Sequence, residues 1–133
     1  MKTPFAVLAI SICLVGFSAA TVAAPDISAG KAVFDRACAA CHMPGGEGLP
    51  GVFPPVKKSD YVKKATPLQL VKVLDNGLTG EITVNGQKYN SAMPPLALSD
   101  EDTAAVLTYL IQGLNDGKTA LTPEQVKRLR SGK

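Results

Sequence analysis

Residues 38–42 read Cys-Ala-Ala-Cys-His (CAACH), and the rest of the chain is best understood outward from this stretch. On a helix, residues three and four positions apart lie on the same face. Cys38, Cys41 and His42 are therefore expected to project towards one place. The two alanines between the cysteines keep that approach free of bulky side chains. The spacing presents two thiols and one imidazole to a single object.

Four chemistries use cysteine and histidine so close together. A structural zinc ion needs four ligands, whereas residues 25–133 contain only these two cysteines and this histidine. A thioredoxin-like redox pair is expected in a βαβ unit, which the sequence does not indicate. A disulfide between Cys38 and Cys41 leaves His42 without a role. The pattern C-x-x-C-H is the attachment motif of a c-type haem, and we take this as the favoured interpretation.

The composition also favours a large apolar group in the interior. A chain of 133 residues predicts one domain. Residues 43–55 (MPGGEGLPGVFPP) contain four glycines and four prolines, too many for a helix or a strand. Residues 25–133 have no tryptophan and few large side chains to cover such loops. Their aromatic residues are Phe34, Phe53, Tyr61, Tyr89 and Tyr109.

Helix and turn signals predict a small, mostly helical domain with long loops and one β-hairpin. Thr-Pro pairs are typical helix starts, and Asn-Gly between short β-prone runs is a strong hairpin signal. The expected elements are a helix from Asp26 to about Ala40, a helix begun by Thr66-Pro67 and ended at Gly77, a hairpin turning at Asn85-Gly86, a helix begun at Ser99, and a helix begun by Thr122-Pro123.

The N-terminus has the three parts of a secretory signal peptide, so residues 1–24 are expected to be removed and residues 25–133 to form the domain. Cleavage after Ala20, Ala23 or Ala24 fits the small residues there, and an uncleaved membrane anchor is the less favoured alternative. We therefore expect an exported, periplasmic protein without a membrane span in its mature form.

Residues 25–133 hold 13 basic against 11 acidic side chains, which argues against a nucleic-acid partner.

Residues from about 27 to 113 resemble class I cytochromes c. The resemblance rests on the order of Gly30 and Phe34, then CAACH, then Met-Pro-Pro at 93–95, then Tyr109. It implies a mostly α fold with helices packed around one covalently bound haem c. Cys38 and Cys41 would hold the haem through thioethers, and His42 would bind the iron.

The second axial position of the iron has one obvious candidate. The chain has no second histidine, and Met43 adjoins His42 on the same side, so Met93 remains. Axial His/Met ligation raises the reduction potential and suits electron transfer. The alternatives are that Met93 only fills the core, or that the sixth position is open, as in a ligand sensor or peroxidase. Pro94 and Pro95 restrict the backbone beside Met93, and the hairpin just upstream could brace it.

The family resemblance also implies a proline carbonyl that accepts a hydrogen bond from the other nitrogen of the histidine. Pro54 is the first choice for this role, and Pro55 is the alternative, because adjacent prolines blur the alignment. Such a bond would orient the ring of His42 and raise its basicity.

These expectations describe a one-electron carrier and not an enzyme. Five lysines could steer an acidic redox partner, although a solvated lysine-rich surface is the more common explanation: Lys57, Lys58, Lys63, Lys64 and Lys72. Residues 51–62, 76–95 and 122–130 more specifically resemble cytochrome subunits or domains of periplasmic dehydrogenases and copper nitrite reductases. A dedicated cytochrome subunit is therefore the alternative to a free carrier.

Overall fold

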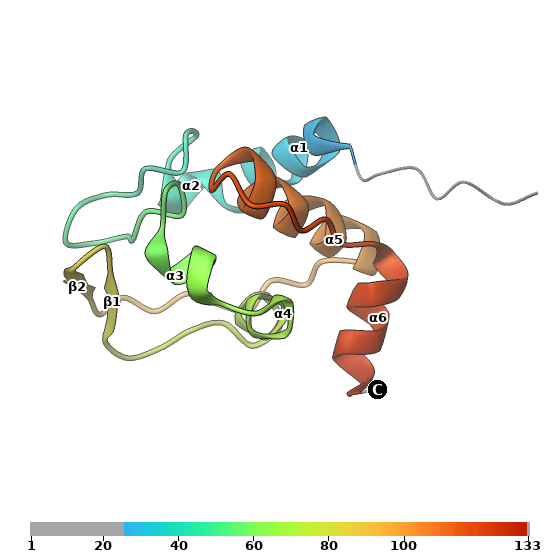
Figure 1. Cartoon of the computed structure of the whole chain (residues 1–133). Helices are drawn as coiled ribbons and strands as arrows, with labels where there is room; N and C mark the ends of the chain where they lie inside the picture. The colour runs from blue at the N-terminus through green and yellow to red at the C-terminus, as the bar shows by residue number, and fades with distance from the viewer. Residues whose placement is uncertain (1–25, 133) are drawn as a thin grey trace, which may run out of the picture.

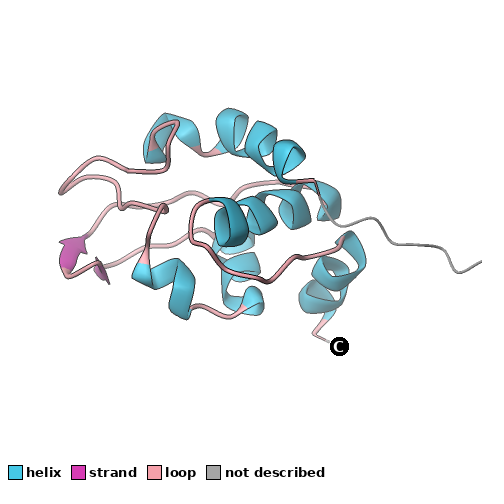
Figure 2. Ribbon diagram, turned by 45° about the horizontal axis from the view of Figure 1, so that its top comes forward, coloured by secondary structure: helices cyan, strands magenta, loops and turns pink. Residues whose placement is uncertain are grey.

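The computed structural model describes residues 26–132, so the predicted signal peptide lies outside the described residues. The described chain is mostly helical, with long loops and one antiparallel strand pair at the end opposite the last helix, as Figures 1 and 2 show. Among these residues, no helix has the length and apolar character needed to cross a membrane. The elements are α1 (Ile27–Ala37), α2 (Ala39–His42), α3 (Asp60–Lys64), α4 (Pro67–Asn76), β1 (Ile82–Val84), β2 (Gln87–Tyr89), α5 (Asp100–Thr108), the π-helical turn η1 (Tyr109–Gly113) and α6 (Pro123–Ser131).

Helices α1 and α5 cross closely, and the crossing depends on a glycine. A Cβ atom on Gly30 would lie 2.2 Å from the carbonyl oxygen of Ala105 and 2.6 Å from the Cβ of Tyr109. Beside this contact, the rings of Phe34 and Tyr109 pack with their centroids 5.6 Å apart at an interplanar angle of 60°. Tilted aromatic pairs of this kind add to the stability that burial provides. The crossing therefore fixes the end of α1 relative to α5.

The first helix ends earlier than the sequence predicted. The expected helix to about Ala40 is interrupted at Cys38, whose φ of −122° and ψ of −34° separate α1 from α2. Helical hydrogen bonding resumes at once, because the N–H of His42 donates to the carbonyl oxygen of Cys38 at 2.9 Å. No glycine or proline marks the break, so the sequence carries no local signal for it.

Helix α3 was not predicted, because five residues are too few for a periodic pattern. Its N-cap is Ser59, which accepts a hydrogen bond from the N–H of Val62. The hairpin turns at Asn85-Gly86 as predicted, with positive φ at both residues. It leans on α3 through two hydrogen bonds: Asp60 N–H donates to Asn85 Oδ1 at 2.9 Å, and Asn85 N–H donates to Asp60 Oδ1 at 2.7 Å.

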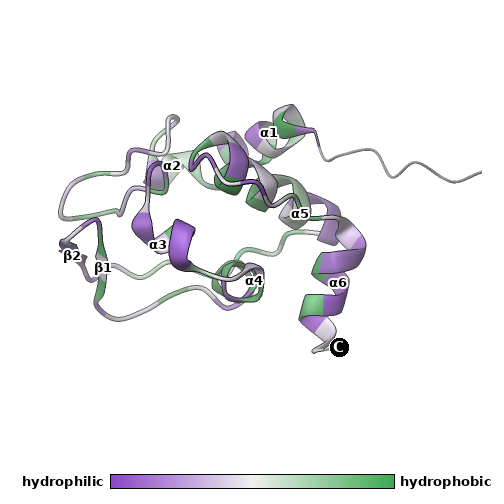
Figure 3. Ribbon diagram, in the orientation of Figure 1, coloured by the Kyte–Doolittle hydropathy of each residue, from purple (hydrophilic) through white to green (hydrophobic). Residues whose placement is uncertain are grey.

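Helix α6 packs against α4 and α5. Both Thr-Pro starts form capping boxes, with Gln69 completing the one at α4 and Gln125 the one at α6. Figure 3 shows α6 mostly hydrophilic with a narrow hydrophobic band. Near its C-terminal end, the Arg130 guanidinium binds Asp75 of α4 at 2.6 Å and also pairs with Asp100 of α5. A partly exposed bidentate arginine pair of this kind has better geometry than most surface ion pairs.

The contact between α3 and the hairpin predicts a pH dependence. The hydrogen bond from Lys64, followed by that from the N–H of Asn85, holds the pKa of Asp60 below its usual value of 3.8. A depressed pKa in the folded state gives stability that is complete above the unfolded pKa and is lost as pH falls through the folded pKa. We expect the protection of the Asn85 amide against hydrogen exchange to fall as the pH drops from about 5 to about 2.

The control for this prediction is Asp60→Asn, which keeps a side-chain oxygen as acceptor but does not titrate. In that variant the protection of Asn85, corrected for intrinsic exchange, should stay level over the same pH range. An equal decline in both proteins would contradict the assigned role of Asp60.

Candidate functional site

An apolar cavity lies between α1, α4, α5 and the hairpin. It encloses about 640 Å³ of empty space, a figure that includes the part open to solvent. Most of its walls are apolar side chains from all four elements, among them Phe34, Leu70, Leu74, Val84, Leu107 and Leu110. The protein thus keeps an apolar space in its middle where a domain of this size would otherwise pack side chains.

A second cavity, of about 510 Å³ by the same measure, adjoins the first. His42, Pro54 and Met93 line both cavities, as do Leu78 and Ile82. An imidazole from one segment and a thioether from another therefore border the same hollow. The structure brings together two of the residues predicted from the sequence, although 51 positions separate them.

The two cysteines differ in environment. Cys38 is buried and lines the first cavity, whereas Cys41 is exposed and lines the second. No disulfide joins Cys38 and Cys41, the alternative that the sequence left open. Burial raises the pKa of the Cys38 thiol to about 11, so it is protonated at neutral pH. A protonated, buried thiol is a poor metal ligand and a poor redox nucleophile.

The ring of His42 is oriented by a backbone carbonyl. Its Nδ1 lies 2.9 Å from the carbonyl oxygen of Pro54. Of the two prolines left open by the sequence, the contact belongs to Pro54 and not to Pro55. Since a carbonyl only accepts, Nδ1 carries the proton and the lone pair is on Nε2. The close approach requires Gly48, where φ is +69° and a Cβ would lie 2.7 Å from the Pro54 carbonyl oxygen.

Met93 is held by Leu78 through backbone hydrogen bonds in both directions. The N–H of Leu78 donates to the Met93 carbonyl at 2.9 Å, and the N–H of Met93 donates to the Leu78 carbonyl at 2.8 Å. Gly77 makes this pairing possible, because a Cβ there would lie 2.3 Å from the Met93 carbonyl oxygen. The sequence suggested the hairpin as the brace, and Gly77 only as a helix end. The main brace is this bridge to the end of α4.

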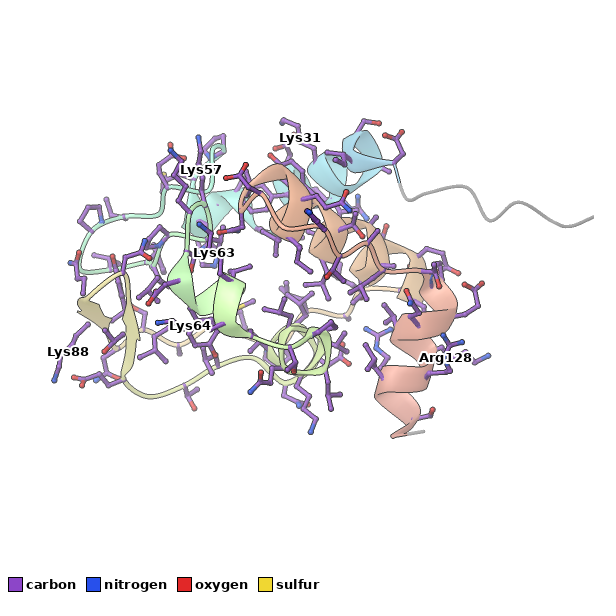
Figure 4. All side chains as sticks on the ribbon, in the orientation of Figure 1. Lys31, Lys57, Lys63, Lys64, Lys88 and Arg128 are labelled. Carbon is purple, nitrogen blue, oxygen red and sulfur yellow. The ribbon has the colours of Figure 1, made fainter. Side chains whose placement is uncertain are left out.

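The predicted docking lysines are all exposed. Figure 4 labels three of them, Lys57, Lys63 and Lys64, on or next to α3. Lys64 is already paired with Asp60 at 2.9 Å, and both line a surface groove with Lys72 of α4. Lys64 and Lys72 therefore share one groove, but Lys64 is partly neutralised by its neighbour Asp60.

The donors and the hollow fit a covalently held haem. Two thiols, one imidazole with a free Nε2 and one thioether border an apolar space, and the described residues bury no side-chain nitrogen or oxygen without a hydrogen-bond partner. Fold and site together define a small helical domain built around an apolar prosthetic group.

Comparison with known proteins identifies the family. Residues 27–113 match the sequence model of the family named cytochrome c, so the chain belongs to the cytochrome c family. Its fold is that of class I cytochromes c, and its cofactor is covalently attached haem c. It is 40% identical over 105 residues to cytochrome c-552 of Thermus thermophilus, a match that covers 72% of this chain and 80% of that protein.

Two further relatives are more distant. Cytochrome c6 of Bryopsis maxima is 30% identical, over 69% of this chain and 97% of that protein. The cytochrome c subunit of the quinone-dependent alcohol dehydrogenase of Gluconobacter oxydans is also 30% identical, over 78% of this chain but 22% of that protein. These relatives are electron-carrying cytochromes, and one is a dehydrogenase subunit. This chain is accordingly a mono-haem electron carrier.

The bridge between Leu78 and Met93 predicts that Gly77 cannot be replaced. Gly77→Ala should lower the free energy of unfolding by about 2–5 kcal/mol, because it adds backbone strain at φ +72° to a collision with the Met93 carbonyl. The Met93 amide should also exchange faster with solvent, since its acceptor on Leu78 is displaced. Chemical denaturation and amide exchange of the haem-loaded protein measure the two effects.

Gly86→Ala is the matched control, because Gly86 has φ +82° but no atom within 4 Å of an added Cβ. It should cost only the strain, about 1–2 kcal/mol, and leave Met93 exchange unchanged. Equal losses in the two variants would show that the Gly77 contact is unimportant.

Proposed function

We propose that this protein is an exported, periplasmic one-electron carrier whose haem iron is bound by His42 and Met93. The single observation that carries the proposal is that these two side chains, from separate segments, both line the two adjoining cavities. The His42 ring is held by its hydrogen bond to the Pro54 carbonyl, and Met93 is held by its backbone pairing with Leu78. Such restraints favour a fixed pair of axial ligands over a mobile one.

Cys38 and Cys41 would hold the haem by thioethers, and the haem supplies an iron that accepts and returns one electron. Their unequal burial is consistent with this arrangement, because one attachment point would lie inside the cavity and the other nearer solvent. His42 would bind through Nε2, the nitrogen that its hydrogen bond to Pro54 leaves unprotonated. His/Met ligation then favours a relatively high reduction potential.

An iron with both axial positions filled offers no coordination site to a substrate. That is the reason to propose a carrier and not an enzyme, with the electron passing through the haem edge. The competing readings give Met93 a core-filling role or leave the sixth position open to a small ligand. Met93 is half-buried and borders both cavities, which favours ligation over simple core filling.

A substitution of Met93 tests the proposed ligation. In the oxidised protein, Met93→Ala should abolish the methionine–iron charge-transfer band at the red end of the spectrum, because the sulfur is the donor. Met43→Ala should keep the band, since Met43 adjoins His42. Carbon monoxide should bind the reduced Met93→Ala protein readily and the unsubstituted protein poorly at neutral pH. A band that survives in Met93→Ala, or rapid carbon monoxide binding without substitution, would refute the His/Met assignment.

Two modes of action remain for the carrier. In the first, it moves freely between redox partners and docks briefly through the exposed lysines Lys57, Lys58, Lys63 and Lys72, which make no ion pair among residues 26–132. In the second, it is the dedicated cytochrome subunit of a dehydrogenase or nitrite reductase. The Gluconobacter relative, whose name describes such a subunit, supports the second mode. The c-552 and c6 relatives, which this chain spans for most of their lengths, favour the first.

The native mass separates these modes. We expect the haem-bearing protein in an unfractionated native extract to elute from size exclusion near its own mass, below the 13.8 kDa of the full chain once residues 1–24 are removed. Elution in a large complex that resists moderate salt would contradict the free-carrier mode and support the subunit. Sequencing of the mature N-terminus on the same sample tests removal of the signal peptide.

A further inference from the structure

Asn115 is a buried polar residue to which the proposed electron-transfer site assigns no role. It lies two residues beyond the end of η1 and is only 5% exposed. Its amide nitrogen donates to the carbonyl of Val56 at 2.7 Å and to that of Leu110 at 2.8 Å, and its Oδ1 accepts from the N–H of Ser59 at 2.8 Å. Both amide hydrogens are therefore used, and one side chain joins the end of the last long helix to a distant loop.

That loop leads directly to the residue that orients His42. The N–H groups of Val56 and Lys57 donate to the carbonyl of Gly46 at 2.8 and 2.9 Å, and the N–H of Lys58 donates to the carbonyl of Leu114 at 3.0 Å. Together with Asn115, these bonds hold residues 56–59 between Gly46, in the loop that follows the CAACH motif, and Leu114, at the end of η1. Two positions before Val56 stands Pro54, whose carbonyl accepts from His42 Nδ1.

The backbone between Pro54 and Val56 has little conformational freedom. Pro54 and Pro55 both have φ fixed by their rings, so few torsions separate the Pro54 carbonyl from the Val56 carbonyl that Asn115 holds. Asn115 itself lines neither of the two cavities that His42 borders. It can therefore affect the histidine through the backbone without touching the space that the haem would fill.

We propose that Asn115 is a positioning residue that holds the Pro54 carbonyl against His42 and thereby lowers the reduction potential of the haem. The inference rests on the proposed ligation of iron by His42. A hydrogen bond from Nδ1–H to a carbonyl makes the imidazole a stronger donor through Nε2. A stronger donor favours the oxidised iron over the reduced iron. Loosening the Pro54 contact should therefore raise the potential.

The test replaces Asn115 with serine in the haem-loaded protein. The shorter side chain cannot bridge Val56 and Ser59 together, and the space left can admit water to their backbone groups. We expect a reduction potential shifted to more positive values. We also expect the Nδ1 proton of His42 to exchange about tenfold faster, the loss that one net hydrogen bond implies. Proton NMR and redox titration give the two readouts.

Thr108→Val is the matched control. Thr108 is fully buried, and its hydroxyl donates to Ala104 at 2.8 Å and accepts from the N–H of Leu121 at 2.9 Å. Its loss should also destabilise the protein, but these contacts do not involve residues 54–59. The potential and the His42 proton exchange should then stay at the unsubstituted values. If Asn115→Ser lowers stability but leaves both readouts like those of Thr108→Val, the positioning role is refuted and Asn115 is only a structural residue.

A measurement on the unsubstituted protein decides the matter even if Asn115→Ser does not yield holoprotein. Under the proposal, the Ser59 amide and the His42 Nδ1 proton exchange through one shared opening, so their rates respond equally to low denaturant concentrations. Unequal responses would overturn it. Failure of the proposed ligation is separate: His42 protons without a paramagnetic shift in the oxidised, unsubstituted protein would refute ligation itself, whatever the variants show.

Discussion

The close crossing of α1 and α5 at Gly30 is the contact on which the rest of the structure depends. With no Cβ at position 30, the two backbones approach until only a hydrogen atom fits between them. This places Phe34 and Cys38, at the end of α1, opposite Leu107 of α5 and Leu110 of η1. These four side chains form one wall of the cavity. Cys38, the last of these wall residues on the α1 side, is also the first residue of the CAACH motif. Helix α6 packs on the outer side of α4 and α5, to which Arg130 joins it through ion pairs.

The two candidate iron ligands lie on short or irregular segments, so the frame alone does not hold them. Each is instead braced by a hydrogen bond to the backbone that a glycine permits. Gly48 lets the chain approach the Pro54 carbonyl that binds the His42 ring, and Gly77 lets it approach Met93. Both glycines have positive φ, where side chains are strained. These hydrogen bonds explain how a domain with few aromatic residues can hold an apolar cavity in its interior. Backbone hydrogen bonds substitute for side-chain packing around the hollow.

Sequence reasoning succeeded where the signal was local. The Thr-Pro pairs at 66 and 122 and the Asn-Gly turn at 85 each act through the backbone geometry of a few adjacent residues, and all three appear as expected. It failed where the cause lay elsewhere in the chain. Helix α1 stops at Cys38 without a breaking residue, and the five residues of α3 are stabilised by contacts with the distant hairpin, including the reciprocal bonds of Asp60 and Asn85.

The same division applies to the site. The order of the residues establishes which donors are available: two cysteines and one histidine in a single motif, and no second histidine beyond it. A count of available side chains limits the chemistry regardless of how the chain is folded. The folded chain is needed to show that Pro54 and not Pro55 contacts His42, that Leu78 pairs with Met93, and that Asn115 binds Val56, 59 positions earlier. These contacts join segments distant in sequence, and their partners depend on the path of the whole chain around one apolar hollow.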